Sequence, residues 1–171
     1  GAVVDQRSVR RMIIGLLLAT VLSGMGSTQG YELPFSDEIS IGHTGWTARY
    51  SEEHELSEWV AYQLTEEELS FDRDRTNDFR EDASISTGSS DPDDYDGWGS
   101  TFHRGHLAPA ADFRWSRDAM SDTFLMSNIA PQRAGFNLGL WKRLENRVRV
   151  WAVNNDELYI VVGPVLTDEI D

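Results

Sequence analysis

Apolar and polar positions follow recognisable periods along this chain, and these periods predict its main elements. Residues 45–50 and 58–64 are β-prone stretches around a polar connection, which predicts a β-hairpin. A helix over Glu52–Leu64 is the alternative, because Glu and Ala favour helices. FHRGHLAPAADF, residues 102–113, begins as a strand and breaks at Pro109. ELYIVVGPVL, residues 157–166, is typical of a buried strand, which should be paired on both sides although the chain ends five residues later.

The helical period is clearest in residues 135–155. One face is formed by residues at spacings of four, four and three, namely Leu140, Leu144, Val148 and Trp151. Ser116 is expected to cap a short helical turn that leads into an extended segment at 124–127. Residues 65–100 are acidic and rich in turn formers, which predicts a long surface loop.

The N-terminal segment has the layout of a secretory signal. Arg7, Arg10 and Arg11 precede an apolar run from Met12 to about Met25, and small residues follow. We therefore expect residues 1–30 to be a signal or membrane-targeting segment outside the fold, and residues 31–171 to form one domain. The expected location is secreted or periplasmic, with no stable membrane association after cleavage. A retained anchor is the weaker alternative because a span needs ~20 residues, and a buried helix is another.

Charge is distributed unevenly along the chain. The net charge of −14 argues against a polyanionic partner. However, residues 37–96 hold eighteen acidic side chains and four Arg, whereas residues 104–149 hold eight basic and four acidic side chains. The basic segment is therefore a candidate phosphate-binding face. The absence of Cys excludes disulfides, thiolate metal sites and a Cys nucleophile.

Two histidines and an arginine lie close together in residues 103–106. Residues three apart in a strand point to opposite faces, so His103, His106 and Asp112 form a poor zinc site, although zinc stays an alternative. A neutral His106 can act as a general base near pH 7. Arg104 is two residues away on the same strand face, where its guanidinium can hold a phosphate.

The basic helix offers oxygen ligands for a hard cation. Asn137 lies at its start, and Glu145 lies eight residues on, two turns up and about 80° around the helix. An amide oxygen near a carboxylate suits Mg²⁺, which keeps several of its waters. Spacing alone favours a simpler reading, in which Asn137 caps the helix and Glu145 pairs with Arg149.

Three motifs in a fixed order resemble one known family. HRGHLAPAADF, SDTFLMSNIAPQ and GFNLGLWKRLE are similar to the DNA/RNA non-specific endonucleases, and weaker likeness extends over roughly residues 40–166. The resemblance implies an α+β fold of the ββα-metal (His-Me finger) type with a central antiparallel sheet. It also implies a C-terminally incomplete copy, because family members usually continue with more strands, and it allows a homodimer.

The resemblance also assigns roles to residues. His106 matches the general base and Arg104 the motif's arginine, while Asn137 matches the metal ligand and Glu145 the acid that orders metal-bound water. Asn128 matches a residue that supports the active site. The phosphate-binding arginine of the family is expected to be Arg75, with Arg80 as the alternative, because the gap pattern there is ambiguous.

The expected activity is Mg²⁺-dependent, with Mn²⁺ as a substitute, and cuts DNA and RNA to 5′-phosphate and 3′-hydroxyl ends. The sequence departs from the family at His103, where Asp is usual. We expect its side chain to point away from His106 and to alter local support without loss of chemistry. The alternatives are a non-catalytic nucleic-acid-binding ββα module and an inactive truncated nuclease.

Overall fold

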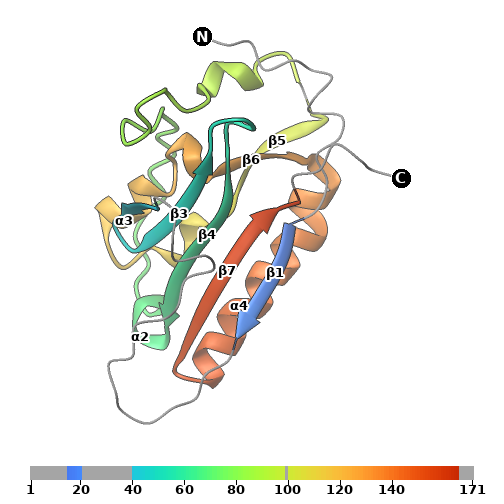
Figure 1. Cartoon of the computed structure of the whole chain (residues 1–171). Helices are drawn as coiled ribbons and strands as arrows, with labels where there is room; N and C mark the ends of the chain where they lie inside the picture. Colours follow the sequence, from blue (N-terminus) through green and yellow to red (C-terminus); the bar gives the residue numbers. More distant parts are fainter. Residues whose placement is uncertain (1–14, 21–39, 99, 166–171) are drawn as a thin grey trace.

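A five-stranded antiparallel sheet forms one layer of the protein (Figure 1). The computed structural model describes residues 15–20, 40–98 and 100–165. The strand order is β1-β7-β4-β3-β2. The strands are β1 (Gly15–Thr20), β2 (Ile41–His43), β3 (Trp46–Ser51), β4 (Leu56–Thr65) and β7 (Glu157–Pro164). β3 and β4 pair in the register Trp46↔Tyr62, so the predicted hairpin is confirmed and the helical alternative is wrong.

Strand β7 is paired along both edges. β4 lies on one side with Tyr62 opposite Ile160, and β1 lies on the other with Leu18 opposite Val161. The expectation that this apolar strand is paired on both sides is therefore confirmed. β1 comes from the apolar run that the sequence analysis excluded from the fold, and its residues form a strand where a buried helix was the alternative. The division of the chain at residue 30 stays a prediction.

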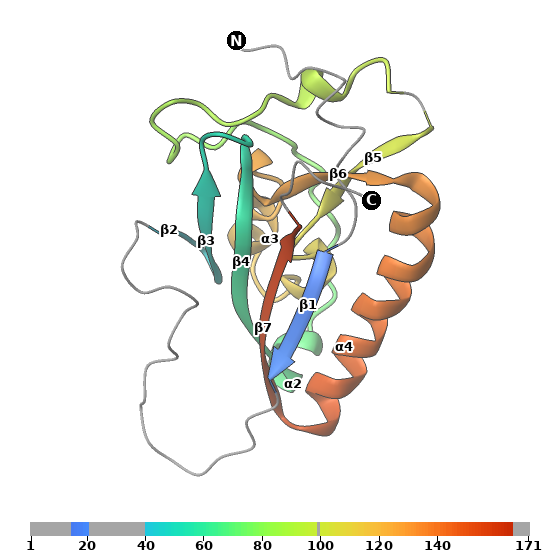
Figure 2. The ribbon, with the colours of Figure 1, turned by 45° about the vertical axis from the view of Figure 1, so that its right-hand side comes forward.

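A second unit combines a strand pair with a helix. β5 (Phe102–His106) pairs antiparallel with β6 (Ile129–Arg133). The chain then enters η4 (Phe136–Trp141) and α4 (Lys142–Asn154), and α4 packs against β4 and β7 (Figure 2). The core between these layers includes Val60, Ile160 and Val148. This β-β-α order confirms the predicted α+β class.

The helix after β6 does not keep one regular period. Residues 136–141 form a π-helix, in which the N–H of Lys142 donates to the carbonyl of Asn137. The predicted apolar face is wrong at both ends, because Leu140 is 59% exposed and Trp151 is 38% exposed. Val148 is buried as predicted, and the other buried side chains on this helix are Trp141 and Ala152.

Short elements fill the connections. These are α2 (Glu66–Leu69), η1 (Pro92–Tyr95), η2 (Ala110–Asp112), α3 (Arg117–Asp122) and η3 (Met126–Asn128). The Ser116 hydroxyl accepts from the N–H of Ala119, which confirms the predicted cap, whereas η3 replaces the expected extended segment. The acidic segment is more than a surface loop, because Asp82, Ile85 and Ser90 are buried. Among the described residues no helix has the length and apolarity needed to cross a membrane.

Candidate active site

His106 lies at the end of β5 in an aromatic environment. Its ring is 4.9 Å from that of Phe124 and 5.6 Å from that of Phe79, both in edge-on geometry. The Nε1–H of Trp141 donates to the His106 carbonyl at 3.2 Å, which ties η4 to the strand. Burial, followed by the charge of Arg75, lowers the pKa of His106 to about 3. The ring is therefore neutral at pH 7 and able to accept a proton.

The Nε2 atom of His106 is buried and has no hydrogen-bond partner within the described part of the chain. An unpaired polar atom in the interior costs stability, and such atoms call for a functional explanation. Strands β5 and β6 are closely packed beside His106. A Cβ on Gly105 of β5 would lie 2.2 Å from Cδ of Gln132 on β6. Glycine at this position lets the side chain of Gln132 pack directly over β5.

Two arginines stack on the aromatic rings that flank His106. The guanidinium of Arg104 lies 4.7 Å from the centre of Phe79, and that of Arg75 lies 4.8 Å from the centre of Phe124. Arg104 and His106 thus contact the same ring, as the predicted shared strand face requires. Phe79 and Phe124 were not predicted as parts of the site, although each lies inside a stretch that carries the family likeness.

The structure separates the two candidate arginines of the acidic segment. Arg80 donates to the carbonyl of Ser121 at 2.8 Å and to the carboxylate of Asp122 at 3.2 Å. Its charge is offset by Asp122 and Asp78. Arg75 is partly buried and stacks on Phe124. Its charge acts on both His106 and Glu145. Arg75 is therefore the better candidate for phosphate contact.

Asn137 lies in the π-helical turn η4 and faces the strand pair. Its Nδ2 atom is 3.3 Å from Nδ1 of His103 on β5. It is not the helix cap of the simpler reading, because Gly135 occupies the cap position. His103 and His106 have different neighbours, the first Asn137 and the second Phe79 and Phe124. The expectation that the two side chains point apart stays a prediction.

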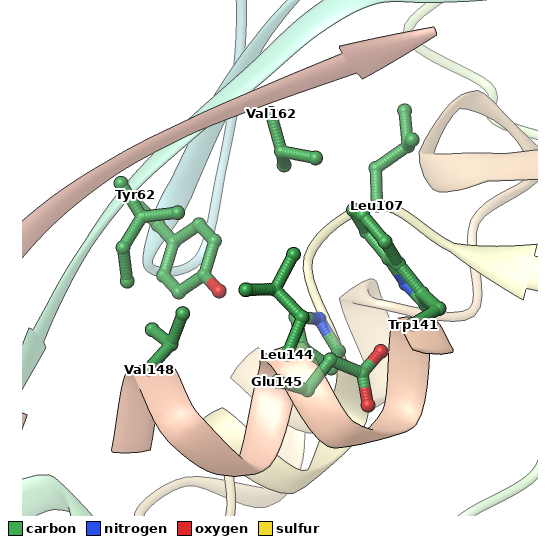
Figure 3. A pocket seen from close by; sticks show the side chains of 9 residues that line it. Tyr62, Leu107, Trp141, Leu144, Glu145, Val148 and Val162 are labelled. Atoms are coloured by element: carbon green, nitrogen blue, oxygen red, sulfur yellow. The ribbon is translucent and has the colours of Figure 1, made fainter. Parts of the chain in front are cut away.

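Glu145 projects from α4 at the edge of a small, largely apolar pocket (Figure 3). The pocket is lined by Tyr62, Leu107, Pro109, Trp141, Leu144, Glu145, Val148, Ile160 and Val162. Burial, and then the negative charge of Asp112, raise the pKa of Glu145 to about 7, against the opposing effect of Arg149 and Arg75. This carboxyl group therefore changes its protonation near neutral pH.

Asp112 connects the segment after β5 to the sheet and to α4. It is buried, and it accepts hydrogen bonds from the Tyr62 hydroxyl at 2.9 Å and from Arg149 at 2.6 Å. Arg149 is thus engaged with Asp112, which weakens its reading as a simple partner of Glu145. The zinc alternative finds no support, since no three His, Cys, Asp or Glu side chains gather as metal ligands in the described regions.

Asn128 is a fully buried support residue. Its Oδ1 accepts from the N–H of Ala108 at 2.8 Å, and its Nδ2 donates to the carbonyls of Ala108 and Thr123 at 2.9 and 2.8 Å. These bonds fix the chain just after His106. We therefore regard its role as positioning, because no atom of Asn128 is left exposed to a substrate.

A second buried network anchors the acidic segment. The carboxylate of Asp82 lies 2.9 Å from Nε2 of His43 and accepts from the hydroxyl of Ser127. Burial alone would raise the pKa of Asp82, but the close contact with His43 and the hydrogen bonds from Ser127 and the backbone of Ser84 lower it to about 2. Because Ser127 precedes Asn128, this network ties the segment that carries Arg75 and Phe79 to the site.

A strand pair that ends in a buried histidine, followed by a helix with an asparagine and a glutamate, defines the ββα-metal class of nucleases. The chain belongs to the DNA/RNA non-specific endonuclease family, whose model matches residues 24–171. The predicted family and fold class are therefore confirmed.

Several named relatives are similar to this chain. Human mitochondrial endonuclease G is 44% identical over 63% of this chain and 36% of its own length. The bovine protein of that name is 36% identical over 83% of this chain and 47% of its own. A solved structure titled as an EndoG/EndoGI complex superposes with a TM-score of 0.64 at 30% identity, over 71% of this chain and 51% of that one. The chain thus spans less than half the length of these curated relatives.

The names of the relatives contradict the predicted secreted or periplasmic location. Endonuclease G from human and cow and the nuclease EXOG from zebrafish are all named mitochondrial. The error has a physical source, because Arg-rich, acid-poor N-termini are common to secretory signals and mitochondrial transit peptides. Part of the apolar run on which the prediction rested also pairs with β7 as strand β1.

Proposed function

We propose that this chain is a metal-dependent endonuclease that hydrolyses phosphodiester bonds of DNA and RNA and leaves 5′-phosphate and 3′-hydroxyl ends. One observation carries the proposal. A buried, neutral His106 lies between two aromatic rings, and each ring holds an arginine beside it. This places a proton acceptor next to two cations, which is the set of groups that water attack on a phosphodiester requires.

His106 takes the proton of the attacking water. Its low pKa keeps the ring unprotonated, but a base with so low a pKa is weak. A phosphate bound to Arg75 offsets the positive charge that helps to lower this pKa. Substrate binding thus moves the pKa of His106 toward neutrality, where proton transfer is more favourable.

Arg75 and Arg104 hold the substrate and stabilise negative charge. Stacking on Phe124 and Phe79 restricts both guanidinium groups, so less conformational entropy is lost when they bind a phosphate. They contact phosphate and not base edges, which accounts for cleavage without sequence preference.

The oxygen donors fit a hard divalent cation, for which we propose Mg²⁺ with Mn²⁺ as a substitute. Asn137 offers an amide oxygen and Glu145 a carboxylate, and both belong to the same helical segment. A π-helical turn rotates successive residues through a smaller angle than an α-helical turn, which reduces the 80° offset expected between them. When bound, such a cation neutralises charge on the reacting phosphate.

Plasmid cleavage tests the proposal. Purified protein is incubated with supercoiled plasmid and with RNA, in Mg²⁺ or in EDTA, and His106→Ala is compared with His54→Ala, a control in an exposed turn. We expect Mg²⁺-dependent nicking of both substrates, a loss of about 10²–10⁴-fold in His106→Ala and none in His54→Ala.

Two outcomes would contradict the proposal. Binding of nucleic acid by the folded protein without cleavage in Mg²⁺ or Mn²⁺ would favour the non-catalytic module or the inactive truncated nuclease. Cleavage in EDTA that survives His106→Ala would reject the mechanism.

The homodimer that the resemblance allows stays a prediction.

A further inference from the structure

His103 occupies a distinctive position on β5. The family resemblance implies an Asp at this position, and the Nδ1 atom of His103 lies 3.3 Å from Nδ2 of Asn137. The side chain is partly buried, and its backbone pairs with Gln132 on β6. Asn137 is the residue that the proposed function uses as a cation ligand, so His103 contacts that ligand directly.

The two ends of the Asn137 amide offer different groups to His103 and to a cation. A side-chain amide has an oxygen at one end and an NH₂ group at the other. If the NH₂ group donates to Nδ1 of His103, the oxygen is left for the cation. In the opposite orientation the ring would donate to the oxygen, and the NH₂ hydrogens would face the cation, which is electrostatically unfavourable.

We propose that His103 is a positioning residue that accepts a hydrogen bond from Asn137 and thereby aims the amide oxygen at the metal ion. The inference rests on the proposed function of the same site. A neutral imidazole with its proton on Nε2 presents a lone pair at Nδ1, and a carboxylate presents an equivalent acceptor. His and Asp can therefore perform the same task at position 103, although a His does so with one tautomer.

Metal binding by the 171-residue protein tests this role without reference to catalysis. Mn²⁺ is titrated into wild type, His103→Ala, His103→Asp and the control His54→Ala, and free Mn²⁺ is measured by electron paramagnetic resonance. Since loss of a partner of a ligand typically costs 10–100-fold in metal affinity, we expect His103→Ala to bind Mn²⁺ at least about tenfold more weakly. His103→Asp and His54→Ala should stay within about threefold of wild type.

An Asn137→Asp background separates orientation from general support. A carboxylate offers an oxygen at either end, so its orientation needs no acceptor at position 103. His103→Ala should therefore lose most of its effect on Mn²⁺ affinity in this background. Circular dichroism and thermal unfolding establish that each variant is folded.

Three results would overturn the inference: unchanged affinity in His103→Ala, an affinity in His103→Asp as low as that in His103→Ala, or an equal loss in both backgrounds. These failures differ from failure of the proposed function. In that case folded wild type would not bind Mn²⁺ at all or would not cleave nucleic acid.

Discussion

Glu145 is a residue whose ionised carboxylate is destabilised by its surroundings in the folded protein. Its pKa is raised to about 7 because the carboxyl is buried and lies near the negative charge of Asp112. The folded protein therefore holds this proton up to a higher pH than the unfolded chain does, where the ordinary value is 4.5. Consequently the free energy of unfolding falls as the pH rises from about 4.5 to about 7.

Glu145→Gln should stabilise the protein at pH 8 and change little at pH 4.5. Because the carboxyl keeps some contact with solvent, we expect a gain on the order of 1–2 kcal/mol in the free energy of unfolding at pH 8. Urea denaturation at the two pH values measures it. A gain of the same size at both pH values would mean that the ionised carboxylate is not the cause.

The residues of the site were predicted unevenly from sequence. His106, Arg104, Asn137 and Glu145 lie in contiguous motifs, and the family resemblance of these motifs named them as candidates where spacing alone did not. Arg75 was preferred to Arg80 on an ambiguous gap pattern, because both are arginines in one acidic segment. Their different contacts, with Phe124 and with Asp122, exist only in the fold.

At the scale of elements, the helix that begins at Phe136 departs most from expectation. The apolar period assumed 3.6 residues per turn throughout, but residues 136–141 form wider π turns. Leu140 therefore faces solvent while its neighbour Trp141 is buried. Hydrophobic periodicity does not reveal such a turn, since the tertiary contact of Trp141 with the His106 carbonyl fixes the register. The β3–β4 hairpin was predictable because its signal is local.

Deletion of Leu138 should convert the π turns to a regular α-helix. Leu138 is 64% exposed, so its loss removes little packing. Trp141 and Glu145 are held by the core, and Asn137 would consequently rotate by about 100° relative to them. We expect a loss of roughly 10²-fold in nuclease activity with native helix content, measured by plasmid nicking and circular dichroism. Leu138→Ala, which keeps the residue count, should retain activity; equal losses in both variants would contradict this account.

At the scale of the molecule, the protein must attract a polyanion despite a net charge of −14. The acidic η1 lies beside strand β5, which carries Arg104, and the rings of Tyr95, Trp98 and Phe102 contact one another in series. Arg104 follows two residues after Phe102 and is close enough to influence the pKa of Tyr95. The sequence gives the net charges of these segments, but their proximity depends on the fold.

Neutralising the exposed acids of this end should strengthen nucleic-acid binding. At a separation of about 10 Å in water, each carboxylate repels a phosphate by about 0.4 kcal/mol, so Asp93→Asn/Asp96→Asn should bind roughly fourfold more tightly. Fluorescence anisotropy with a labelled oligonucleotide in EDTA measures binding without cleavage. The gain should disappear near 0.5 M salt, where screening acts within a few ångströms.

Glu66→Gln/Glu67→Gln on α2, at the opposite end of the molecule (Figures 1 and 2), removes the same charge and should give a much smaller gain. Equal gains in the two double variants would show that net charge, and not the position of η1 beside β5, limits binding.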